Sequence, residues 1–117
     1  MIKPMFVLLA LSTVVFGSSP AFAGEGSRCH FHGNTPAQEQ TVLMCAEQRR
    51  DLYLEQGTIE VSWQGAQPES IEVIDGEKGQ EWRVLFRNES ASERGKQTLY
   101  MFFTLPGNFI AANYSGK

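Results

Sequence analysis

The hydrophobic and polar positions divide the chain into an apolar leader, a helical segment and a series of strands. Residues 5–16 (MFVLLALSTVVF) are interrupted by only one serine and one threonine, follow the positive charge of Lys3, and precede a small-x-small sequence at residues 21–23 (AFA). These are the three parts of a secretory signal peptide. The apolar run is shorter than the roughly 20 residues that a transmembrane helix needs. The sequence therefore predicts that residues 1–23 are removed on export and that the mature protein has no membrane span.

The next periodic segment, residues 36–56, is predicted to be a helix. Thr35 is a favourable N-cap, Pro36 suits the first helical position and Gln38 completes a capping box. Gly57 suits the left-handed position that ends a helix. An inward stripe with spacings of three and four residues is expected to comprise Val42, Cys45, Ala46, Leu52 and Tyr53, with Arg49 as a polar interruption.

After the helix, apolar and polar residues alternate, which is typical of half-buried strands. Strands are expected at residues 58–63, 70–75, 81–88, 98–104 and 109–114. The first of them would place on one side Ile59, Val61 and Trp63. The sequence DGEKG at residues 75–79 favours a hairpin, and LPGN at residues 105–108 fits a type II turn with proline second and glycine third.

These elements predict an α+β fold with one N-terminal helix packed on a four- to five-stranded antiparallel meander sheet. The single domain is expected to span residues 35–117, preceded by an irregular lead-in at residues 24–34 that lacks any periodicity.

The strand at residues 98–104 is apolar on both faces, so the sheet face opposite the helix is not a plain solvent face. Leu85, Tyr100 and Phe102 are the candidate interaction surface on that face, for an envelope protein, a peptide or a second copy of the chain. The alternative is that the lead-in and loop side chains cover it.

The charge of the chain bears on its class of partner, and its two cysteines bear on their oxidation state in an exported protein. The formal net charge is −3 and the basic residues are scattered, which argues against a nucleic-acid partner. The one adjacent basic pair, Arg49 and Arg50, is interpreted as part of a solvated helix face. Cys29 and Cys45 in an exported chain favour a disulfide, and the alternative is a pair of reduced metal ligands.

No arrangement typical of catalysis occurs in the sequence, so we expect a non-enzymatic protein without a cofactor other than a metal ion. His30 and His32 are the candidate metal ligands, because positions i and i+2 of an extended segment place both imidazoles on one side, where they could bind Cu²⁺ or Zn²⁺. Further ligands would have to come from Cys29 and Cys45 as thiolates or from Glu25. The alternative is that these are surface or structural histidines beside a disulfide.

Several motifs resemble a family of short exported bacterial proteins of unknown function. They are CHFHGN at residues 29–34, Cys45, SW at residues 62–63, EW at residues 81–82, FRN at residues 86–88, TLYMFF at residues 98–103, Gly107 and NYSGK at residues 113–117. The resemblance covers essentially the whole mature chain and implies a bacterial envelope setting without an assigned activity. The order of the elements is also similar to PepSY-like domains, which are small exported modules associated with binding and inhibition.

The function expected from the sequence is that of a periplasmic, non-enzymatic module that binds another envelope protein or a peptide through its sheet. The alternative is a periplasmic copper- or zinc-binding protein that uses His30 and His32.

Overall fold

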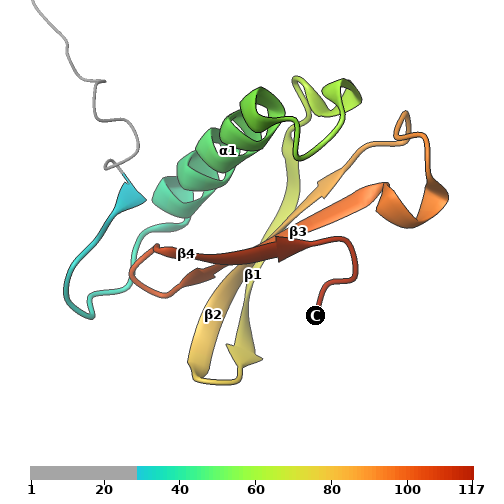
Figure 1. Cartoon of the computed structure of the whole chain (residues 1–117). Helices are drawn as coiled ribbons and strands as arrows, with labels where there is room; N and C mark the ends of the chain where they lie inside the picture. Colours follow the sequence, from blue (N-terminus) through green and yellow to red (C-terminus); the bar gives the residue numbers. More distant parts are fainter. Residues whose placement is uncertain (1–28) are drawn as a thin grey trace, which may run out of the picture.

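A helix lying across one antiparallel sheet makes up the domain, and the computed structural model describes residues 29–117. The expected signal peptide and the start of the lead-in, residues 24–28, lie outside the described residues. The elements in chain order are α1 (Glu39–Gln56), η2 (Val61–Trp63), β1 (Pro68–Gly76), β2 (Gly79–Arg87), η3 (Arg94–Lys96), β3 (Thr98–Thr104) and β4 (Phe109–Asn113). The strands follow one another across the sheet in the order β1-β2-β3-β4, with α1 over one face (Figure 1). The predicted fold of one helix and an antiparallel meander is confirmed, with four strands.

The helix ends where the sequence predicts but begins three residues late. Gly57 has a φ of 73°, and its N–H donates to the carbonyl of Leu54 at 3.2 Å, so it ends α1 as expected. At the other end Gln38 occupies the N-cap position without a side-chain hydrogen bond. The predicted start at Pro36 is wrong, because Gln38 still has extended backbone angles (φ −82°, ψ 151°). The N–H of Ala37 donates to the carbonyl of Leu105 at 2.7 Å. This bond holds the preceding segment against the β3–β4 turn.

The strand expected at residues 58–63 is wrong. Ile59 and Trp63 are buried there, but Val61 between them is 74% exposed. The residues form a bend and the 3₁₀ turn η2, in which the N–H of Trp63 donates to the carbonyl of Glu60 at 3.0 Å. A 3₁₀ turn has three residues per turn, so it replaces the two-residue alternation that a strand would impose.

The two hairpins connect neighbouring strands tightly. In the β1–β2 hairpin Gly76 pairs with Gly79, so the turn lies where the glycine-rich sequence predicts it. In the β3–β4 hairpin the N–H of Gly107 donates to the carbonyl of Thr104 at 2.8 Å, so this turn begins one residue earlier than expected. Gly107 has a φ of 111°, and a Cβ there would lie 3.0 Å from the ring of Phe31. Both facts favour glycine at this position.

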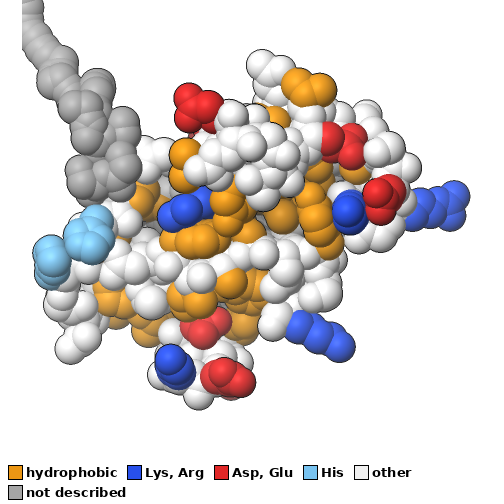
Figure 2. Space-filling model, in the orientation of Figure 1, with side chains coloured by type: hydrophobic (Ala, Val, Ile, Leu, Met, Phe, Trp, Pro, Cys, Tyr) orange, Lys and Arg blue, Asp and Glu red, His pale blue; other side chains and the backbone are white. Residues whose placement is uncertain are grey.

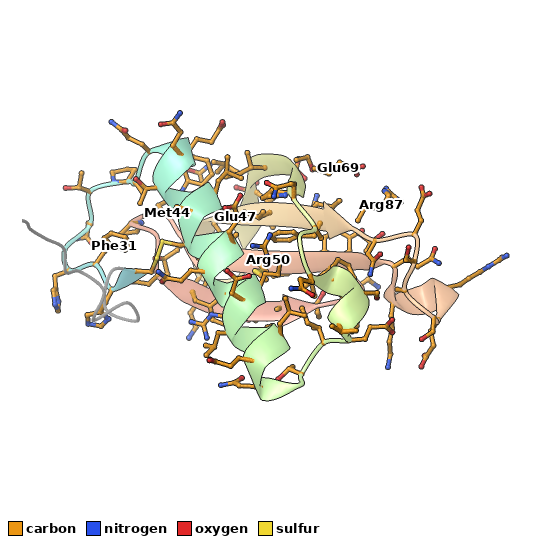
Figure 3. The ribbon with its side chains drawn as sticks, turned by 90° about the horizontal axis from the view of Figure 1, so that it is seen from above. Phe31, Met44, Glu47, Arg50, Glu69 and Arg87 are labelled. Atoms are coloured by element: carbon orange, nitrogen blue, oxygen red, sulfur yellow. A yellow bond between two sulfur atoms is a disulfide. The ribbon has the colours of Figure 1, made fainter. Side chains whose placement is uncertain are left out.

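The core lies between α1 and the sheet and includes Val42, Cys45, Ala46, Ile59, Trp63, Val84, Phe86, Leu99, Met101 and Phe103. Two expectations about the helix faces are wrong. Leu52 is 36% exposed, because it lies about two turns beyond Cys45 at the margin of the buried face. Arg50 is 8% exposed, because its guanidinium donates to the carbonyl of Ala66 and pairs with Asp51 at 3.0 Å. Figure 3 shows Arg50 close to the axis of the domain, between the ends marked by Phe31 and by Glu69 and Arg87.

The disulfide expected from the sequence joins Cys29 of the lead-in to Cys45 of α1, with the two Cα atoms 5.8 Å apart. Because both sulfur atoms are in the bridge, neither is a thiolate ligand. The bond attaches the lead-in to the helix over a sequence separation of 16 residues.

We predict that replacing both cysteines by alanine lowers the free energy of unfolding by about 3 kcal/mol, because the bridge closes a loop in the unfolded chain. Urea denaturation of the two proteins measures the loss. The intact mass of the exported protein should be two hydrogens below that of its reduced form. Equal urea midpoints would contradict the prediction.

Candidate functional site

A groove lies between α1 and β4 on the helix side of the sheet. Its volume is about 410 Å³, and its apolar lining comprises Cys29, Cys45, Leu52, Phe103 and Phe109. The disulfide therefore forms part of its wall. In the space-filling view, hydrophobic side chains gather between α1 and β4, with a basic side chain among them (Figure 2).

Arg49 is the basic group in this groove. Its Cζ lies 3.8 Å from the ring centre of Phe109 and 5.9 Å from that of Tyr53, so the guanidinium stacks on an aromatic surface. Within the described residues it has no carboxylate partner. The other charged residues of the lining are Asp51, which pairs with Arg50, and Glu55, about 9 Å further along the helix. Arg49 is thus a half-buried positive charge available to an anionic group.

The floor of the groove is close to the edge of the sheet. β4 is the last strand in the sheet order, so it has a paired strand on one side only. An edge strand presents unpaired N–H and C=O groups to which an extended segment can add. Phe109 contributes to both features, because it begins β4 and lines the groove.

The opposite face of the sheet, where the sequence placed the interaction surface, is partly covered by the C-terminal residues. A Cβ on Gly116 would lie 2.9 Å from Cζ of Tyr100, so the backbone of the tail lies directly on that ring. The side chain of Asn113 turns the tail back, because its Oδ1 accepts from the N–H of Gly116 at 2.7 Å. Figure 1 shows this C-terminal segment on the side of the sheet away from α1. The sequence predicted that the lead-in and loop side chains would provide such a cover, whereas the C-terminal tail provides part of it.

The three residues of the expected surface differ in exposure. Phe102 is only 6% exposed, whereas Leu85 and Tyr100 are half-buried. Phe102 pairs with Arg83 of β2 and Ala111 of β4 in the sheet register. Its burial within the single chain is the behaviour of a core residue.

The two histidines, His30 and His32, follow Cys29, which lines the groove. Both side chains are exposed, and their ring centres are 4.9 Å apart with the planes at 89°. No group of three or more His, Cys, Asp or Glu residues that could hold a metal ion occurs among residues 29–117. Glu25, considered as a further ligand, lies outside the described residues.

Two side chains outside the groove lining, Glu60 and Tyr114, have shifted pKa values. The hydroxyls of Ser62 and Ser92 donate to the carboxylate of Glu60 and lower its pKa below the ordinary value. Burial raises the pKa of Tyr114 above the ordinary value. Because the Glu60 bonds join η2 to the loop before η3, they have a structural rather than a chemical role.

A model of a family of unknown function, DUF6488, matches residues 1–117. The chain belongs to this family. A search of curated proteins found no match, and a search of solved structures also found none. The resemblance to a family of unknown function is therefore confirmed, and the comparisons show no link between this DUF6488 member and PepSY-like domains.

Two structural findings bear on where this DUF6488 member resides. None of the helices within the described residues is long and apolar enough to cross a membrane. The Cys29–Cys45 disulfide is consistent with an extracytoplasmic protein.

We predict that Phe102→Ala lowers the free energy of unfolding by about 3–5 kcal/mol, as large-to-small changes at buried aromatic positions do. The matched control is Val61→Ala at a position that is 74% exposed, where the change should be below about 0.5 kcal/mol. Thermal unfolding measures both, and analytical ultracentrifugation measures self-association. A Phe102→Ala protein with an unaltered midpoint and weakened association would show instead that Phe102 belongs to an interface.

Proposed function

We propose that this protein is a periplasmic, non-enzymatic module that binds an extended, apolar, carboxylate-bearing segment of another envelope protein in the groove between α1 and β4. The observation that carries the proposal is the guanidinium of Arg49, which has no carboxylate partner among the described residues and stacks 3.8 Å from the ring centre of Phe109 in a mainly apolar groove.

The groove and the strand edge support an extended peptide as the occupant. A segment added alongside β4 gains main-chain hydrogen bonds, and alternate side chains of that segment point to one face. Those side chains would enter the apolar space beside Leu52 and Phe103. We propose this location in place of the sheet face around Phe102, because Phe102 is buried within the chain and the C-terminal tail covers part of that face.

Charge complementarity supports a carboxylate on the peptide. Taking the Arg49 guanidinium further out of water without an anion would be costly, whereas a carboxylate can accept two parallel hydrogen bonds from it. Glu55 at the far end of the groove disfavours a second acidic residue there.

Peptides of eight residues, alternating valine and threonine with blocked ends and a central Glu or Gln, test the proposal. Titration of the isotope-labelled protein should shift the amide resonances of Leu52, Phe103 and Phe109, and the Glu peptide should bind about tenfold more tightly than the Gln peptide. A tenfold ratio corresponds to about 1.4 kcal/mol, within the range of one charged hydrogen bond.

We predict that Arg49→Gln removes the preference for the Glu peptide while leaving binding of the Gln peptide within about twofold, because only the charged contact is lost. Arg94→Gln, on the exposed turn η3, is the matched control and should preserve the preference. An unchanged preference in Arg49→Gln, or shifts confined to residues of the opposite sheet face, would refute the proposed site.

A further inference from the structure

The segment that carries the two histidines is held in place from both sides. Cys29 is bonded to Cys45 of α1 immediately before His30. The side chain of Asn108 makes two hydrogen bonds to the backbone of Phe31: Oδ1 accepts from its N–H at 2.7 Å, and Nδ2 donates to its carbonyl at 2.8 Å.

The side chain of Phe31 strengthens this anchorage. It packs against the core and lies next to Gly107, where a Cβ would be only 3.0 Å from the ring. The residue between the histidines is therefore held by both its backbone groups and its ring. Figure 3 shows Phe31 at the end of the domain opposite Glu69 and Arg87.

The two imidazoles are available for a ligand. Both are exposed, and within residues 29–117 neither has a hydrogen bond or an ion pair with another group. Their ring centres are 4.9 Å apart. With metal–nitrogen bonds of about 2.0 Å, two imidazoles in adjacent positions on one ion have ring centres on the order of 4.5–5 Å apart. The observed spacing therefore suits a shared ion after rotation of the side chains.

We propose that His30 and His32 form an open, two-imidazole site for Cu²⁺. Copper fits better than zinc, because Cu²⁺ has the highest affinity of the divalent first-row ions and accepts a tetragonal site completed by water. A structural zinc site takes four protein ligands and a catalytic one takes three, and the bridged cysteines are not thiolates. The site is independent of the peptide groove, so either proposal can fail without the other.

Copper titration of the protein recovered after export tests the site, by calorimetry and electron paramagnetic resonance at neutral pH with glycine as a competing ligand. The unaltered protein should bind one Cu²⁺ per chain with two nitrogen ligands from imidazole. His30→Ala and His32→Ala should each weaken binding at least tenfold, because each removes one of two chelating groups.

Stoichiometry separates a shared site from two independent histidines, since the chain has only two. Two ions per chain, with each single variant keeping one ion at unchanged affinity, would overturn the proposal. Unaltered binding by the double variant would overturn it as well, because the copper would then be held elsewhere. Zn²⁺ binding tighter than Cu²⁺ binding would overturn the choice of metal.

Asn108 has a positioning role in this proposal, because its two hydrogen bonds hold the backbone of Phe31 between the two histidines. Asn108→Ala should weaken Cu²⁺ binding severalfold while leaving the nitrogen count unchanged, because the segment loses both clamping bonds. Asn113→Ala, which releases the C-terminal tail at a distance from the histidines, is the matched control and should leave copper affinity unchanged. Equal affinity in Asn108→Ala and the control would refute the positioning role.

Discussion

One helix cannot cover a four-stranded sheet, and the rest of the structure follows from that constraint. A helix with its side chains is about 10 Å across, whereas the outer strands of a four-stranded sheet lie about 15 Å apart. α1 makes its main sheet contacts with β1 and β2, and reaches β4 through Tyr53 and Arg49. The groove over Phe103 and Phe109 is the part of the sheet that the helix leaves uncovered.

Segments outside the helix and sheet complete the burial that these two elements cannot achieve. On the helix side, η2 places Trp63 in the core and the lead-in places Phe31 against the β3–β4 turn. On the opposite side, the C-terminal residues lie on Tyr100. In a small domain each of these additions matters, because the fraction of surface buried on folding falls with chain length.

The two proposed sites share a support. Cys29 lines the groove and also precedes His30, so the disulfide shapes one wall of the peptide site and fixes one end of the metal segment. The β3–β4 hairpin supports both as well, because Phe109 forms the groove floor while Asn108 clamps Phe31. The proposed copper site and the proposed peptide groove thus depend on the same disulfide and the same hairpin.

The sequence by itself determined the fold class, the strand order, the end of α1 at Gly57 and the β1–β2 hairpin, because periodicity and glycine positions are local signals. It also indicated the Cys29–Cys45 bridge, since an exported chain with two cysteines has few alternatives to a disulfide between them.

Only the tertiary structure decided the burial and contacts of residues whose partners lie far away in the sequence. Arg50 is buried because its guanidinium donates a hydrogen bond to the carbonyl of Ala66, sixteen residues away. The segment before α1 is held against the β3–β4 turn by the hydrogen bond from the N–H of Ala37 to the carbonyl of Leu105. The groove at Arg49 and the Asn108 clamp likewise join residues far apart in the chain. Such partners carry no signal in a local pattern, because their effect depends on packing that exists only after the chain has folded.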